Sequence, residues 1–189
     1  MKIKRKKKKY SEKLFNELVL FHLLSIYGYF FEYEASFLLK VSNRTLRRYI
    51  NEIEETCILY RGGGKLETLN ENGYKSYHVS LCFFNNEKDP VKDALNPQTI
   101  ILPIGFCQKH PKGLNSKNQH IVRLTRCALL LHKVQTELKK MDSTRMDIID
   151  VVRNCINYYF DEIKINVSPK TFKRDILLVF DVLVYMQDK

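Results

Sequence analysis

Four polar side chains between residues 41 and 55 have the types and spacing needed to contact DNA bases. At 100° per residue, one face of a helix carries Arg44, Arg47, Arg48 and Asn51. Arginine can bind guanine through two hydrogen bonds and also binds phosphate, while asparagine can pair with adenine. The spacing therefore predicts a helix that enters the major groove. The alternative is an ordinary amphipathic surface helix.

The surrounding residues predict how this helix is positioned. Ser42 is a favourable N-cap because its hydroxyl can accept a backbone N–H of the first turn. The apolar face of the helix consists of Leu46, Ile50, Ile53 and Cys57. Two earlier helices, at 11–27 and 32–39, are expected to complete a three-helix core, the first capped by Ser11 and ended by Gly28.

A β-hairpin is predicted after the third helix. Residues 66–69 can form a strand, the Asn-Gly pair at 72–73 is a strong signal for a type I′ turn, and apolar residues alternate with polar ones over 76–81. Such a hairpin forms the wing of a winged helix. Lys65 and Lys75 would then lie near phosphates that flank the site.

The cap and the basic face are repeated near the C-terminus. The pattern V-S-x-x-T-apolar-basic-R-x-I occurs at 41–50 and again at 167–176, and such self-similarity indicates a duplicated unit. In the second copy Ser168 is the expected N-cap, and Pro169 suits the first helical position. The second basic face consists of Lys170, Thr171, Lys173 and Arg174. Two helix-turn-helix units are therefore predicted.

These segments resemble the helix-turn-helix of the DeoR-type and WYL-regulator winged-helix repressors. The likeness is close over 41–55 and looser over 11–81. It implies DNA contacts by Arg44, Thr45, Arg47 and Arg48. Tyr49 stands where that family usually has Asp, which supports neighbouring arginines, whereas Asp175 holds this position in the second copy. The chain has no Trp and no room for that family's effector domain, so no cofactor is expected.

We expect a mainly α fold with a small β-hairpin wing, built from tandem helix-turn-helix units. The predicted divisions are a basic tail at 1–10, a winged helix-turn-helix domain at 11–84, a linker at 85–119 and a second helical domain at 120–189. The second domain should contain helices at 121–138 and 145–160 before its basic helix.

The tail is the most basic part of the chain. It contributes seven of the eleven net positive charges, which leaves +4 for the remainder. A basic balance of this kind favours nucleic acid or another anionic surface. The tail can add salt-dependent phosphate contacts, or it can serve only as a solubilising terminus.

No catalytic or metal centre is predicted. The five cysteines are scattered and are expected to be reduced thiols: Cys57, Cys82, Cys107, Cys127 and Cys155. Cys107 and His110 form a C-x-x-H pair, but no second pair follows at a zinc-ligand spacing. No nucleophile with a base, paired carboxylates or metal triad stands at a recognisable spacing, so no enzyme is expected. Without a signal peptide or an apolar run of roughly 18 residues, the protein is predicted to be cytoplasmic, without membrane association.

The final helix carries an additional prediction about association, because residues 176–185 are apolar nearly all round. Its own unit can bury one face, with Phe172, Ile176, Val179 and Leu183. The side chains expected outside are Leu177, Phe180, Val184 and Tyr185. Burying each is worth about 1.5–3 kcal/mol, so a homodimer through this helix is predicted. The alternative is that the linker folds back over the same surface.

The leading functional prediction is a sequence-specific protein that binds double-stranded DNA, most simply a transcriptional regulator. Tandem winged helices also resemble plasmid and phage replication initiators, which is one alternative. Another is a protein-interaction module whose second unit does not touch DNA. A pair of promoter half-sites as the target favours regulation, whereas an array of direct repeats favours initiation.

Overall fold

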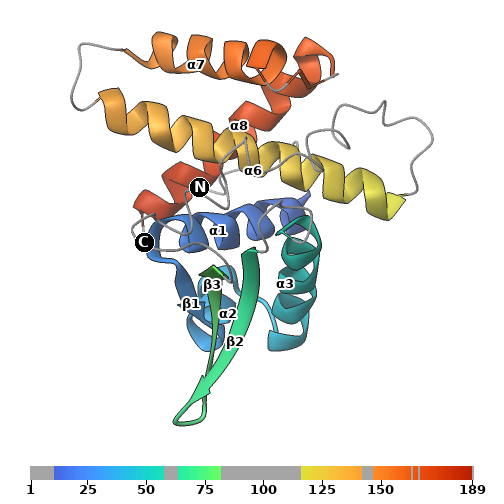
Figure 1. The fold of residues 1–189 in the computed structure, drawn as a ribbon, viewed down its shortest axis with the longest axis vertical. Coiled ribbons are helices and arrows are strands. Elements are labelled where there is room, and N and C mark those ends of the chain that lie inside the picture. Colours follow the sequence, from blue (N-terminus) through green and yellow to red (C-terminus); the bar gives the residue numbers. More distant parts are fainter. Residues whose placement is uncertain are drawn as a thin grey trace, which may run out of the picture.

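The protein has a mainly α fold with one small antiparallel sheet, as predicted (Figure 1). The computed structural model describes residues 11–57, 64–81, 116–141, 147–162, 164–165 and 167–188. The elements are α1 (Glu12–Tyr27), β1 (Tyr29–Phe31), α2 (Glu32–Leu39), α3 (Asn43–Cys57), β2 (Gly64–Glu71), β3 (Tyr74–Leu81), α6 (Ser116–Met141), α7 (Ile148–Asn157), the π-helical turn η1 (Tyr158–Glu162) and α8 (Pro169–Gln187). The predicted tail and most of the predicted linker lie outside the described residues.

Local signals placed the N-terminal elements correctly. The Leu14 N–H donates to the Ser11 hydroxyl at 3.2 Å at the start of α1, and Gly28 ends the helix with φ of 76°. Asn72 and Gly73 adopt φ of 51° and 81° between β2 and β3, where both positive values suit a type I′ turn. The predicted hairpin is confirmed.

The sheet contains a third strand that the sequence analysis did not predict. β1 pairs with β3, with Phe30 opposite Tyr77, so the strand order is β1-β3-β2. β1, which is part of an aromatic run, thereby pairs with the edge of β3 that β2 does not occupy. The N-terminal elements thus follow the order helix, short strand, two helices and hairpin, as α1, β1, α2, α3, β2 and β3.

The first helix is buried on all sides. Every residue from Leu14 to Phe21 is buried, including the polar side chains of Asn16 and Glu17. Near the C-terminal end of the helix, Ile26 and Tyr27 are exposed. Figure 1 shows α1 between α6 on one side and the sheet with α2 and α3 on the other.

The two predicted domains share one hydrophobic core. α6 and α8 both pack on α1, and residues 124–131 of α6 are all buried. Contacts between the halves include the Phe15 and Tyr185 rings, whose centroids lie 5.4 Å apart. Gln135 also contacts His22, with Nε2 and Nδ1 2.7 Å apart. A continuous core of this kind is expected to unfold as one unit.

The helices of the C-terminal half differ from their predicted bounds. α6 begins at Ser116, within the predicted 85–119 linker. The helix predicted at 145–160 is an α-helix only over Ile148–Asn157, after which the chain continues as the π-helical turn η1. Asp147 caps α7 through a capping box with Asp150. None of the described helices is both long enough and apolar enough to cross a membrane.

The repeated motif forms the same local structure in both copies. The Thr45 N–H donates to the Ser42 hydroxyl at 3.2 Å, and the Thr171 N–H donates to the Ser168 hydroxyl at 3.2 Å. The apolar positions that follow are buried in both copies: Leu46 and Ile50 in α3, and Phe172 and Ile176 in α8. The connection before the cap differs between the two copies. A two-residue turn with Lys40 at φ of 54° precedes Ser42, whereas residues 163–167 separate η1 from Ser168.

Burial of α8 is more extensive than predicted. Leu178 and Val182 are fully buried, in addition to Ile176 and Val179. Tyr185, predicted outside, packs on α1 and donates its hydroxyl to the Leu38 carbonyl oxygen at 2.6 Å. Phe180, also predicted outside, is partly buried against the core. Of the four side chains that motivated a homodimer, only Leu177 and Val184 are exposed.

Asp175 lies at the centre of a buried polar network. The Arg126 Nε–H donates to its Oδ2 at 2.7 Å, and the Tyr159 hydroxyl donates to the same oxygen at 2.9 Å. Arg123 Nε lies 3.6 Å from the other carboxylate oxygen. Arg174 makes no such contact within the described residues, so the expected support of the neighbouring arginine is wrong. Asp175 instead joins α8 to α6 and η1.

A second polar cluster joins α6 to α7 around Glu137, whose side chain is 2% exposed. Burial by itself raises the pKa of a carboxyl, but hydrogen bonds from Lys140, Asn154 and Lys133 outweigh it and lower the pKa of Glu137 to about 2. The charged carboxylate is therefore the form that the folded protein favours.

We expect Glu137 to make stability fall in acid. Its pKa is lower in the folded chain than the ordinary value of 4.5, so its contribution is present above pH 4.5 and is lost as the pH falls towards 2. Between pH 6 and pH 3, urea unfolding should show a loss of about 2 kcal/mol beyond that of Glu137→Gln, because the folded carboxylate is still mostly charged at pH 3. Equal acid losses in the two proteins would contradict this assignment.

Candidate nucleic-acid interface

α3 presents the predicted polar face to solvent. Arg44, Arg47, Arg48 and Asn51 are exposed, while Leu46, Ile50 and Ile53 are buried opposite them. Within the part of the chain that the structure describes, the side chains of Arg44 and Asn51 make no hydrogen bond or ion pair, so they are available to a ligand. Thr45 is half-buried, and its hydroxyl lies 3.0 Å from the Ser42 hydroxyl, where it closes the cap.

Arg47 is held in place by a buried carboxylate. Its Nε–H donates to Oε1 of Glu32 at 3.0 Å, and its Nη2 lies 2.8 Å from the same oxygen. The hydrogen bond to Glu32 raises the pKa of Arg47, which stays charged. Glu32 is the first residue of α2, where the positive end of the helix dipole favours an anion. The Arg47 side chain is still 57% exposed, so part of its guanidinium remains accessible.

Glu32 also connects α3 to the hairpin. The Tyr77 hydroxyl donates to Oε2 of Glu32 at 3.2 Å, and Lys75 Nζ lies 3.8 Å from that oxygen. Lys75 additionally lies 5.1 Å from the centroid of the Tyr77 ring. One carboxylate thus fixes the helix and the predicted wing relative to each other. Lys75 is half-buried in this network, whereas the position of the Lys65 side chain lies outside the described residues.

Arg48 has a different neighbour from the one that the family resemblance implies. Tyr49, which stands at the family's Asp position, is buried, and the Arg48 guanidinium lies 5.8 Å from its ring centroid. The ring restricts the arginine by a cation–π contact, not by an ion pair. The direct carboxylate support in this unit goes to Arg47 and comes from Glu32, 15 residues earlier in the chain.

The cavity between α3 and the hairpin has mixed charge. Its lining includes Arg47, Asn51 and Lys75, but also Glu54 and Glu67. Carboxylates on this side repel phosphate and can accept hydrogen bonds only from donor groups of bases. The charge distribution therefore favours an anionic ligand at the N-terminal half of α3, where Arg44, Arg47 and Arg48 lie.

The second basic face lies elsewhere on the molecule. Lys170, Lys173 and Arg174 are exposed and Thr171 is half-buried, all in the first turns of α8. Figure 1 shows this end of α8 near α7, across α6 from the sheet and α3. The two basic faces that the sequence predicted are both present, but the structure does not bring them together into one surface.

Sequence reasoning missed Glu32, the residue that organises this face. No local pattern marks it, because its partners Arg47 and Tyr77 are 15 and 45 residues away. The one available signal was an acidic residue at the start of a helix within an aromatic run, which ordinarily indicates only a favourable helix terminus. No protein-family model, curated protein or solved structure was found to match this chain.

Proposed function

We propose that this protein binds double-stranded DNA sequence-specifically and acts as a transcriptional regulator in the cytoplasm. The observation that carries the proposal is the exposed face of α3 within a winged helix-turn-helix, where Arg47 is fixed by Glu32 and Arg44 has no partner among the described residues. In this reading the N-terminal half of α3 enters the major groove, and the β2–β3 hairpin lies along the adjacent backbone. The DeoR-type and WYL-regulator resemblance supports this arrangement.

The charge of the chain is consistent with such a partner. The net charge of +11 attracts a polyanion, and the arginines of α3 offer the geometry that reads guanine. Orientation of Arg47 by Glu32 reduces the entropy lost on binding, because the side chain is already held. A fixed, half-exposed arginine is better suited to base recognition than a freely moving one.

The test begins with selection of bound fragments from a random DNA library, which yields the preferred site. Arg44→Ala should then lose roughly 1 to 3 kcal/mol of affinity for that site in a competition assay, with a much smaller loss for unrelated DNA. The matched control is Arg153→Ala, since Arg153 is an exposed arginine on α7 that pairs with Asp150.

Two results would count against the proposal. If the library yields no enriched site, the protein does not read sequence. If Arg44→Ala weakens specific and unrelated DNA equally, the residue contacts phosphate and α3 is not a reading helix. The arrangement of the selected sites also separates regulation from replication initiation, because half-site pairs favour the former and arrays of direct repeats the latter.

A protein-interaction role is a second candidate, favoured by an aromatic surface formed by the end of α1 and by α2. Phe37 is 86% exposed, and Tyr33 and Tyr27 are also exposed beside an apolar cavity. A cluster of exposed aromatic side chains commonly marks a protein contact.

A homodimer through α8 also remains a proposal, and it now rests on Leu177 and Val184. Sedimentation at micromolar concentration will show whether the protein is a monomer.

A further inference from the structure

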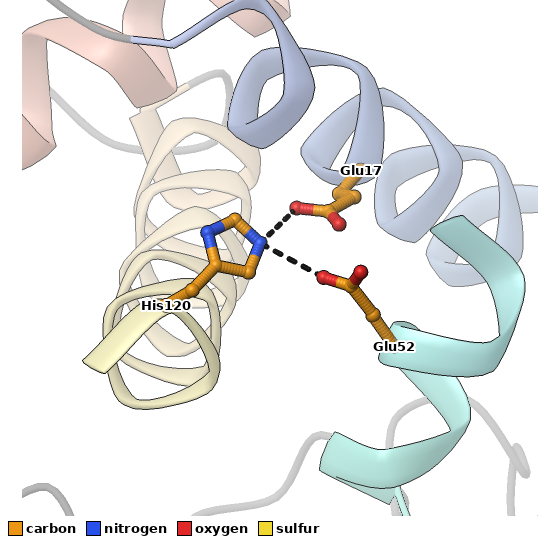
Figure 2. A group of neighbouring side chains, drawn as sticks. All are labelled: Glu17, Glu52 and His120. Atoms are coloured by element: carbon orange, nitrogen blue, oxygen red, sulfur yellow. Dashed lines mark hydrogen bonds and ion pairs between the residues drawn. The ribbon is translucent and has the colours of Figure 1, made fainter. Parts of the chain in front are cut away.

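Three polar side chains from three helices meet where α1, α3 and α6 pack against one another. Glu17 comes from α1, Glu52 from α3 and His120 from α6 (Figure 2). His120 Nε2 lies 2.8 Å from an oxygen of Glu17 and 3.2 Å from an oxygen of Glu52. The three ligand atoms all lie within 4.8 Å of one another. The sequence analysis predicted none of them, because they are far apart in the chain.

A single hydrogen bond from His120 cannot satisfy both carboxylates of this cluster. One imidazole nitrogen can offer a single N–H, yet two carboxylates point at it. Glu17 is fully buried, and its Oε1 accepts no hydrogen bond from any described residue. Two carboxylates in this position require more positive charge than one shared proton provides.

Lys13 supplies part of that charge. Its ammonium group contacts Glu52 and lies 3.9 Å from Oε1 of Glu17. The side chain is one-third exposed, and a lysine is long enough to turn back to solvent when another cation arrives. Lys13 contacts the same Glu52 oxygen, Oε2, that faces His120, so its ammonium group turns away to solvent when the ion binds.

We propose that Glu17, Glu52 and His120 bind a divalent transition-metal ion of the zinc class, with water as a further ligand. One imidazole nitrogen and two carboxylate oxygens are donors that such ions accept, whereas magnesium and calcium prefer oxygen ligands alone. Tetrahedral ligands at about 2.0–2.1 Å from zinc lie about 3.3 Å from each other. The 2.8 and 3.2 Å separations at His120 approach that value, so small outward movements admit the ion.

The bound ion ties α3 to α1 and α6. Glu52 lies one helical turn after Arg48 on α3, while Glu17 and His120 belong to the two helices that form the centre of the core. Binding of the ion to the folded chain stabilises it by mass action. The expected consequence is a protein whose thermal stability rises with zinc concentration.

The experiment uses the full chain after removal of metals with a chelator, with Co²⁺ as the spectroscopic probe. We expect saturable visible absorption at one Co²⁺ per chain, without the sulfur charge-transfer band that cysteine ligands produce, and loss of the signal when Zn²⁺ is added. Zn²⁺ should also raise the melting temperature. Glu52→Gln and His120→Ala, at positions that are less buried than Glu17, should each weaken binding at least about tenfold.

Two controls make the result decisive. His78→Gln removes a histidine on the sheet, far from the cluster in the chain, and should leave metal binding unchanged. Cys107→Ser tests the competing C-x-x-H pair at Cys107 and His110, and should also leave it unchanged. Circular dichroism establishes that each variant is folded. Absence of saturable Co²⁺ binding, or binding that survives His120→Ala and is lost in Cys107→Ser, overturns the proposal.

Discussion

Asp175→Ala is expected to lose about 3–5 kcal/mol of unfolding free energy, because it leaves a buried arginine without its partner. The Asp175 side chain is fully buried, and the Arg126 side chain is 6% exposed. The substitution also removes the acceptor of the Tyr159 hydroxyl, which is buried as well. Urea unfolding followed by circular dichroism measures the loss.

The matched control is Asp161→Ala, an exposed aspartate on η1, which should change stability by less than about 0.5 kcal/mol. Because the cost comes from the uncompensated charge, combining Asp175→Leu with Arg126→Met should recover a substantial part of it. A loss below about 1 kcal/mol in Asp175→Ala would mean that water reaches Arg126, and that the network contributes little to stability.

A fragment that ends at residue 84 should fail to fold cooperatively, although the sequence predicted an independent domain at 11–84. In the full chain, residues 14–21 of α1 are all buried, and α6 and α8 provide part of that burial. Exposing several large apolar side chains at about 1.5–3 kcal/mol each costs a free energy comparable with the 5–15 kcal/mol that usually stabilises a small protein. Circular dichroism should show reduced helix content and no sigmoidal melting.

Complementation provides the control for this fragment. If α1 requires α6 and α8, mixing residues 1–84 with residues 85–189 should restore the spectrum of the intact chain. A fragment that melts cooperatively by itself would instead establish two separate domains, as the sequence predicted. The contacts at stake include Glu17 with His120 and Phe15 with Tyr185, each of which links the two halves.

The parts of the fold that the sequence predicted are those determined by neighbouring residues. Caps at Ser11, Ser42 and Ser168 depend on a hydroxyl and a backbone N–H three residues away. The hairpin turn depends on Asn72 and Gly73 accepting positive φ. The exposed face of α3 follows from helical periodicity alone, which is why the exposure of Arg44 and Asn51 was predicted correctly.

The parts that the sequence did not predict depend on distant pairings. β1 becomes a strand only because β3 pairs with it, and the aromatic run at Tyr29–Phe31 gives no sign of that register. Residues 14–21 of α1 and 124–131 of α6 are all buried because the two halves pack together, and no pattern within either helix indicates that packing. The family resemblance gave Asp175 a supporting role for neighbouring arginines, whereas its partners Arg126 and Tyr159 lie on α6 and η1.

The exposed face of α3, our candidate DNA-binding face, shows the same contrast between local and long-range determinants. The periodicity that exposes the arginines lies within one helix, whereas the carboxylate that orients Arg47 comes from Glu32, 15 residues earlier in the chain. Glu32 becomes a partner of Arg47 and Tyr77 only when α2, α3 and β3 meet. Sequence reasoning therefore identified candidate contacts, but it could not identify which of them is held in a fixed geometry.

The burial of α1 on all sides has a consequence for synthesis on the ribosome. Proteins are translated from the N-terminus, so α1 emerges first, while α6 and α8 that cover it emerge last. Until residue 187 has left the exit tunnel, the apolar side chains of α1 have no complete covering. We expect the nascent chain to depend on molecular chaperones during this interval, and to reach its native state only after translation of α8.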